Sequence, residues 1–315
     1  MKKAVFCLLF TLFTVQIVSQ ESQNDYNFLR LPVSAHAAAL GGDNISIIKD
    51  DATLMFNNPA LISSVSDKTI NLNFMSYMEG TKLASASFTK IINDKATWAV
   101  SAQYIDYGNI KEVTEDNIEQ GTFSAKDISI AGYFAYTLSN KIVGGITAKC
   151  ISSHIAGYNS LAMGVDLGLN YYDDERDFSV SAVAKNLGGQ LKAYDETYEG
   201  IPLDLQIGAS KRVINSPFRF SATIVDLNHW DYSFINHMVA GLDLILSDNI
   251  YLSCGYNFRR AHEMKITDSD NESSSHGAGF SFGGGIELER FKLQLSYGKY
   301  HVSSSSILVN VSYSL

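Results

Sequence analysis

The side chains that could do chemistry are few, and their spacing fits no known site. Asp268-Ser269-Asp270-Asn271-Glu272 begins like a calcium-binding loop. Such a loop needs a turn glycine where Ser273 stands and a carboxylate where Gly279 stands. We therefore expect an acidic surface loop, with weak binding of a divalent cation as the alternative.

No other grouping points to catalysis or to a bound metal. The seven histidines are scattered, and no pair has the spacing of a zinc site. No serine, histidine and acid surround a nucleophile elbow. Cys150 and Cys254 are expected on the outward faces of distant strands, too far apart for a disulfide. The sequence predicts a protein that is not an enzyme and has neither metal nor cofactor; an enzyme with its site in long loops is the alternative.

Charged side chains instead recur at alternate positions. Between Leu161 and Tyr171 one parity is apolar throughout, whereas the other holds Ala, Gly, Asp and Asn. Successive side chains of a strand point to opposite faces, and a Lys or Arg on a lipid-facing surface costs roughly 2–4 kcal/mol. We expect the charges of the polar parity to pair across the lumen of a membrane barrel, a substrate-conducting ladder being the alternative. These charges are Lys149, Asp166, Lys185, Asp204, Arg212, Asp243, Glu287 and Lys292.

These charged side chains are expected to lie on strands. The alternation predicts an all-β fold, a transmembrane antiparallel β-barrel of about fourteen strands, an even number as in single-chain bacterial outer-membrane barrels. Most segments approach the roughly 9–11 residues that a tilted strand needs to cross a bilayer. The predicted strands are 69–76, 83–92, 97–106, 127–138, 142–152, 159–172, 178–186, 203–213, 218–226, 238–247, 250–259, 277–288, 291–300 and 306–315.

The links between these strands alternate in length. Short turns are expected at 93–95, 139–140, 173–175, 215–217, 248–249 and 289–290. Long links are expected at 107–126, 187–202, 227–237 and 260–276. Short periplasmic turns opposite long extracellular loops are typical of outer-membrane barrels.

The N-terminal residues indicate where the protein is located, and the net charge indicates which partners are disfavoured. Met1-Lys2-Lys3 and the apolar run from Ala4 to Val18 predict a signal peptide over residues 1–20, with an uncleaved anchor helix as the alternative. We expect the exported protein to lie in the outer membrane. The net charge of −9 disfavours a nucleic-acid partner.

Residues 21–66 show little strand pattern, and the barrel is expected to occupy 67–315. An Ala-rich helix over 35–40 should end at Gly41-Gly42. Asp50 or Asp51 could cap a short helix through Phe56. A barrel of this size has a lumen to fill, so we expect this segment to form a plug. The candidate plug motif comprises Arg30, Pro32, Gly41, Gly42, Asp50, Asp51, Asn58 and Pro59.

Three aromatic residues lie in one predicted link. Trp230, Tyr232 and Phe234 fall within 227–237. Tryptophan and tyrosine dominate interface hot spots, but they also form the aromatic belt of membrane proteins. We expect either a partner-facing loop or part of that belt.

Several stretches resemble one family. The run 26–35 (YNFLRLPVSA), the stretches 39–42, 50–52 and 57–60, and the predicted turn Lys185-Asn186-Leu187-Gly188-Gly189 are similar to the PorQ and PorV family. These are outer-membrane barrels of the type IX secretion system, related to the FadL class. The resemblance covers essentially the whole mature chain and implies a FadL-like barrel with an N-terminal plug.

The resemblance also implies a function. Such a barrel is a non-catalytic scaffold that holds a PorZ-like surface protein beside the sortase PorU and PorV, where secreted cargo is joined to lipopolysaccharide. Outer-membrane lipid or lipopolysaccharide is a further expected partner. The alternative is a FadL-like uptake channel for hydrophobic small molecules, because one fold serves both.

Overall fold

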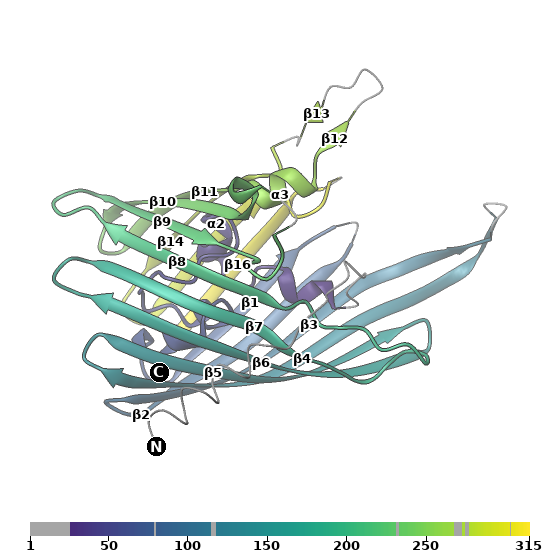
Figure 1. The fold of residues 1–315 in the computed structure, drawn as a ribbon, viewed down its shortest axis with the longest axis horizontal. Coiled ribbons are helices and arrows are strands. Elements are labelled where there is room, and N and C mark those ends of the chain that lie inside the picture. The colour runs from purple at the N-terminus through teal and green to yellow at the C-terminus, as the bar shows by residue number, and fades with distance from the viewer. Residues whose placement is uncertain are drawn as a thin grey trace.

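In the computed structural model, the residues described are 26–78, 80–114, 118–230, 233–267, 273–274, 277–302 and 304–315. The predicted signal peptide and the start of the calcium-like loop lie outside them. The strands form one closed antiparallel barrel (Figure 1). Around the barrel the fourteen strands follow the order β1-β16-β15-β14-β11-β10-β9-β8-β7-β6-β5-β4-β3-β2. The predicted fold class is confirmed.

The barrel closes where β1 (Thr69–Ser76) pairs with β16 (Ser306–Ser314). A separate two-stranded sheet joins β12 (Ile266–Thr267) and β13 (Ser273–Ser274). The other barrel strands are β2 (Lys82–Asn93), β3 (Ala96–Val113), β4 (Glu119–Ser139), β5 (Ile142–Ile155), β6 (Tyr158–Asp173), β7 (Phe178–Lys192), β8 (Asp204–Arg212), β9 (Phe218–Ile224), β10 (Met238–Ser247), β11 (Ile250–Asn257), β14 (Phe280–Glu287) and β15 (Phe291–Gly298).

The wall is apolar outside and polar inside. On β1, Leu72 and Phe74 are 56% and 44% exposed, whereas Asn71 and Asn73 are buried. The eight charges of the polar parity lie on the inner face, and none of them is exposed. This sidedness suits a membrane-spanning barrel, because the backbone of a closed sheet is paired and its outer face is apolar.

Two further features of the chain are the free cysteines on its strands and the length of its helices. Cys150 and Cys254 are free and exposed, as expected for outward positions on separate strands. Among the residues that the structure describes, no helix is long and apolar enough to cross a membrane.

The two ends of the barrel differ. At the turn end, short connections such as 140–141 and 248–249 join the strands. The opposite end, here called the loop end, carries the longer links and lies on the right of Figure 1. One link there holds η5 (Phe234–His237), and another begins with α3 (Phe258–Glu263).

The prediction of a long loop over 107–126 is wrong. Strands β3 and β4 continue as a hairpin that pairs Asn109 with Ser124 and Glu112 with Gly121, and it projects beyond the barrel in Figure 1. Only the part of a strand that faces lipid needs an apolar residue at every second position. Backbone pairing does not depend on this alternation, so the two strands continue as a hairpin after the alternation stops. The pattern therefore marked the membrane-facing part of each strand and not its end.

The prediction of a turn at Lys185–Gly189 is also wrong, because these residues belong to β7. Strand β7 places two residues, Lys185 and Asn186, opposite the single residue Asp166 of β6. Asn186 has φ +61°, a conformation that asparagine tolerates better than most residues. This β-bulge turns two consecutive side chains toward the lumen.

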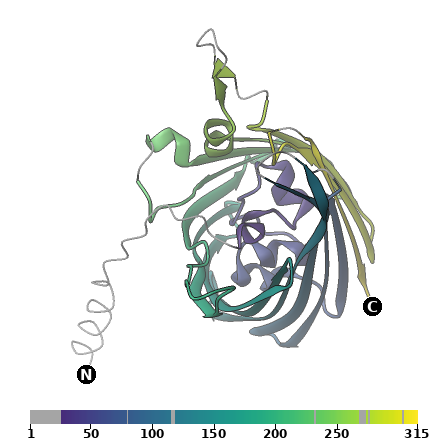
Figure 2. The same cartoon turned by 90° about the vertical axis from the view of Figure 1, so that its right-hand side faces the viewer.

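Residues 26–66, here called the N-terminal segment, lie inside the ring of strands (Figure 2). The segment contains η2 (Asn27–Arg30), α2 (Ala35–Ala39), η3 (Ala52–Phe56) and η4 (Pro59–Ser64). Both expected helices are present, the second as a 3₁₀ helix capped by Asp51. Gly41 and Gly42 end α2 with φ near +108° and +109°.

Candidate functional site

The backbone of the N-terminal segment lies against glycine residues of the inner wall. A Cβ atom on Gly255 of β11 would lie 2.2 Å from the carbonyl carbon of Leu40. A Cβ on Gly145 of β5 would lie 2.3 Å from the backbone nitrogen of Ala60. Only glycine permits so close an approach between backbones. The wall and the segment therefore have complementary shapes.

Amides of the wall satisfy the backbone of the segment. Asn310 of β16 accepts from the backbone nitrogen of Ala35 and donates to the carbonyl of Val33 at 3.1 Å. Asn257 donates to the carbonyl of Gly41 at 3.0 Å. Buried backbone groups cost free energy unless they are paired, so these contacts let irregular backbone lie at membrane depth.

One ionic network joins the segment to β9, β10 and β11. Nε2 of His36 donates to Asp243 at 3.0 Å, Arg219 pairs with the same carboxylate at 2.7 Å, and the Ser253 hydroxyl donates to it at 2.5 Å. Burial lowers the pKa of His36 although Asp243 opposes this shift. The ring is therefore neutral near pH 7, and Asp243 carries the charge that Arg219 compensates.

A second set of contacts fixes the segment near the turn end. Lys49 pairs with Glu287 at 2.8 Å, and Lys292 pairs with Asp50 at 2.5 Å. Gln294 donates to Asp51 at 2.9 Å. Each of these pairs joins the segment to β14 or β15. The prediction that inward charges pair with one another across the lumen is therefore wrong for Glu287 and Lys292, because the segment occupies the lumen and supplies their partners.

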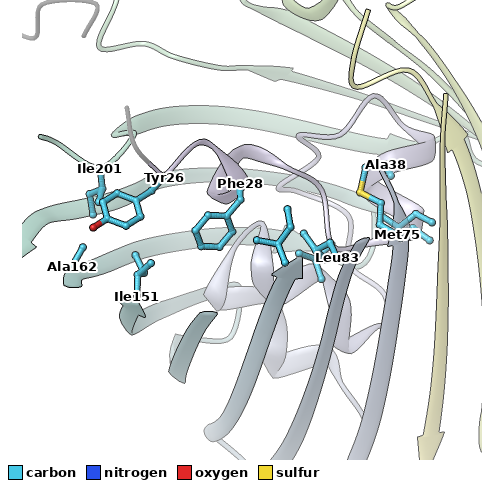
Figure 3. Packing of buried hydrophobic residues seen from close by; sticks show 12 residues of the cluster. Tyr26, Phe28, Ala38, Met75, Leu83, Ile151, Ala162 and Ile201 are labelled. Carbon is cyan, nitrogen blue, oxygen red and sulfur yellow. The ribbon is translucent and has the colours of Figure 1, made fainter. Parts of the chain in front are cut away.

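The link 193–203 folds inward and covers the start of the segment. Ile201 and Ala162 pack on Tyr26, and Ile151 lies nearby (Figure 3). Gln190 donates to the hydroxyls of Tyr26 and Ser160 at 3.4 Å and 3.2 Å.

The candidate plug motif is distributed along the segment and has three structural roles. Gly41 and Gly42 end α2, and Asp50 and Asp51 bond to the wall and to Ser66 or Thr53. Asn58 caps η4, which begins at Pro59. Arg30 and Pro32 lie at the loop end, where they border a cavity.

This cavity, here called the outer cavity, has a volume of about 250 Å³. It lies between residues 27–32 of the segment, the β7 bulge and the links after β1, β9, β11 and β15. A smaller cavity of about 40 Å³, here called the inner cavity, lies on the other side of Leu29–Pro32. The part of the segment that separates the two includes Leu31, Gly42 and Asp43, which border both.

The outer cavity is lined by both charged and apolar side chains. Arg259 pairs with Asp226 at 2.8 Å and with Glu263 at 2.6 Å. Arg260 donates to the carbonyls of 278 and 279 and stacks on Tyr300 at 4.4 Å. These two guanidinium groups are therefore compensated within the protein.

Two cations at the cavity are not compensated in this way. Among the described residues, the side chains of Arg30, which is exposed, and Lys185 have no hydrogen-bond or ion-pair partner. The bulge in β7 directs Lys185 into the cavity, while Asn186 accepts from Lys149 at 2.7 Å and donates to the carbonyl of Pro202 at 2.7 Å. Lys149 pairs with Asp166 at 2.7 Å.

Asp204, directly opposite Lys185 on β8, is one candidate counter-charge at the cavity, and Asp43 is another. Asp43 accepts a hydrogen bond from Asn257 at 3.2 Å. Burial raises the pKa of its carboxyl and the nearby Asp204 raises it further, whereas Lys185 and the two arginines act in the opposite direction.

Trp230 and Phe234, in the link after β9, do not border this cavity. Trp230 and Phe234 are 56% and 55% exposed and stack with ring centroids 6.4 Å apart. Tyr232 lies outside the described residues. Within the described ranges, no three metal-binding side chains gather into a group.

Sequence reasoning placed Lys185 on the inward parity but missed the outer cavity. Arg259 and Arg260 border it from the link after β11, and Tyr300 borders it from the link after β15. Nothing in their local spacing indicates that they meet, because the barrel closure brings them together. The one usable signal was Lys185 beside an asparagine in a glycine-rich strand, which is typical of a bulge.

Known proteins with solved structures share this fold. The toluene transporter TodX of Pseudomonas putida is 15% identical, with a TM-score of 0.60 over 90% of this chain and 98% of its own. The toluene transporter TbuX of Ralstonia pickettii is 10% identical, with a TM-score of 0.56 over the same shares. A FadL homologue of Pseudomonas aeruginosa is 10% identical, with a TM-score of 0.54 and the same coverage.

At these identities the likeness establishes the fold, a FadL-like outer-membrane type of barrel. No protein-family model matches the sequence, and no curated protein matches it. The membership in the PorQ and PorV family stays a prediction.

Proposed function

We propose that this protein is an outer-membrane barrel that takes up small molecules through its loop end, with the N-terminal segment as its plug. The observation that carries the proposal is the pair of cavities on the two sides of Leu29–Pro32. A shift of this short stretch would join the outer cavity to the lumen. The fold shared with transporters of toluene, a small apolar molecule, supports the same function.

The test is uptake of labelled toluene and labelled benzoate by bacterial cells that display the protein. We expect uptake of at least one compound to exceed that of cells without it. Leu31→Trp fills the cavity boundary and should remove the excess, whereas Leu191→Trp, at a 56% exposed position of β7, should not. If neither compound enters faster than in the empty host, or if Leu31→Trp takes up as much as the unchanged protein, the uptake function is wrong.

A second candidate is a membrane anchor for a surface protein, as the family resemblance implies. The packed, polar lumen supports it, because an anchor needs no path through the barrel. The exposed stack of Trp230 and Phe234 at the loop end offers a hot spot of the kind that dominates interfaces. The partner would be PorZ-like, in a complex with PorU and PorV beside lipopolysaccharide.

Chemical cross-linking in native membranes tests the anchor. We expect a PorZ-like protein to be joined to the unchanged chain and lost in the double variant Trp230→Ala and Phe234→Ala. Tyr198→Ala, at another exposed aromatic position, serves as the control. Recovery of general porins alone from all three proteins would contradict the anchor. Equal quenching of Trp230 by brominated lipid in the presence and absence of the partner would assign the stack to the membrane interface.

A further inference from the structure

We propose that His36 of the N-terminal segment is a pH-sensitive latch. While its ring is neutral, it holds α2 against the barrel wall, and protonation of the ring releases α2. The inference goes beyond the proposed function, because it concerns how the segment is held and not what the barrel carries. It applies equally to an uptake barrel and to a surface anchor.

The first step concerns the surroundings of the His36 ring. Its side chain is fully buried, and Nε2 donates to Asp243 of β10 at 3.0 Å. The ring lies against that of Tyr251 of β11, with centroids 4.4 Å apart. Among the described residues, Nδ1 has no hydrogen-bond partner. A neutral ring uses its single N–H here, whereas a protonated ring would bury a second N–H without an acceptor.

The second step concerns Asp243, which already has a counter-charge. Nε and Nη2 of Arg219 lie 2.8 Å and 2.7 Å from one of its oxygens. The Ser253 hydroxyl donates at 2.5 Å to the other oxygen, which also accepts from His36. The carboxylate and the guanidinium therefore balance each other. Protonation of His36 would add an unbalanced positive charge to a site without water access, which is costly.

The third step concerns the remaining titratable groups around α2. Besides Asp243 and Arg219, the groups on the lumen side of the elements that pack on α2 are Tyr251, Glu287, Lys292, Lys49, Asp50 and Asp51, with Arg260 and Tyr300 at its loop end. Strand β16 presents only serine, leucine and asparagine to the lumen. Lys49 and Lys292 pair with Glu287 and Asp50. Gln294 donates to Asp51 at 2.9 Å. Each carboxylate of this set is therefore already engaged.

The fourth step gives the direction of the pH dependence. Burial lowers the pKa of His36 and Asp243 opposes this shift, whereas Lys49 and Arg219 add to it. Once released into water, the ring would have its ordinary pKa of about 6.5. Well above pH 6.5 the ring is neutral in both positions, so pH does not affect how α2 is held. Below pH 6.5 the released ring binds a proton more readily than the buried one, so acid favours release.

Deuterium exchange of the full chain in nanodiscs tests the latch. Peptides that cover residues 36–42 are followed, and the rates are corrected for the direct effect of pH on exchange. The amides of Ala38, Leu40 and Gly42 are hydrogen-bonded within this stretch, so they exchange when α2 opens. Between pH 7.5 and 5.5 we expect the equilibrium constant for opening to rise about tenfold, as a histidine with the ordinary pKa predicts.

Two variants separate the latch from other effects of acid. His36→Gln keeps a donor for Asp243 but cannot be protonated, so its opening constant should not change with pH. Arg219→Gln leaves Asp243 to balance a protonated ring, and the rise should shrink to less than about twofold. His262→Gln, at an exposed position of α3, is the control and should keep the full rise. Heat-dependent gel mobility confirms that each variant is folded.

An opening constant that stays level or falls when the unchanged chain is acidified would overturn the latch. A rise of equal size in His36→Gln would overturn it as well, because other groups would then cause the opening. If His36→Gln does not fold, Arg219→Gln decides, and an undiminished tenfold rise in that variant contradicts the inference. Acid-dependent opening without uptake by cells at either pH would instead refute the uptake function and leave the latch standing.

Discussion

At the scale of single residues, both glycines and charged residues of the inner wall hold the N-terminal segment in place. Gly255 and Gly145 leave room for the backbone of the N-terminal segment, and Asp243 joins that segment to three strands. A substitution at one of these glycines and a substitution of Asp243 are expected to destabilise the protein for different reasons, and each gives a prediction.

Gly255→Ala is expected to displace α2 from the wall. The new Cβ would meet backbone atoms of Leu40 and Gly41 at 2.2 Å and 2.4 Å, and backbone cannot move aside as a side chain can. We expect a loss of about 1–3 kcal/mol of stability, as for other overpacked sites, and faster proteolysis of the N-terminal segment. Gly132→Ala is the control, since nothing lies within 4 Å of its Cβ. Equal protease resistance of both variants would contradict the close seating.

Asp243→Asn is expected to destabilise the barrel by about 3 kcal/mol, because it leaves the buried charge of Arg219 without its partner. Urea unfolding of the protein in lipid, followed by tryptophan fluorescence, measures the change. Asp248→Asn, in an exposed turn, should change stability by less than about 0.5 kcal/mol. A loss no larger than that of the control would show that Asp243 does not hold the segment.

At the scale of elements, period-two alternation predicted the fourteen strands because lipid demands an apolar residue at every second position. On β6 this demand is met from Met163 to Tyr171. It ends above the bilayer, so the hairpin of β3 and β4 was mistaken for a loop. The bulge at Asn186 depends on the pairing of β7 with β6, and the inward fold of Ile201 depends on contacts with Tyr26 and Ala162, which lie far from it in the sequence. The outer cavity, which Lys185 and Asn186 border together with the links after β9, β11 and β15, was therefore not predictable from local pattern.

A disulfide between segment and wall tests whether the segment must move. A Cβ on Gly208 would lie 2.8 Å from Cγ1 of Ile45, so Ile45→Cys and Gly208→Cys bring two Cβ atoms near the separation of a disulfide. The background is Cys150→Ser and Cys254→Ser, which removes the free thiols. We expect the oxidised form to lose uptake and a reductant to restore it. Full uptake by the oxidised form would show that no movement of this part of the segment is needed.

At the scale of the whole molecule, the barrel presents apolar side chains on the outside and holds its own chain on the inside. The apolar outer face fixes it in a membrane. Shape, amides and ion pairs fix the N-terminal segment in the lumen. Small-molecule uptake and surface anchoring both start from this closed barrel, and they differ in whether the segment opens.

The central claim is that the N-terminal segment closes the barrel, and conductance across a planar bilayer tests it most directly. We expect the full chain to show little steady conductance, whereas a chain without residues 26–66 should show large open-channel currents. Large and steady conductance by the full chain, equal to that of the shortened one, would contradict the account.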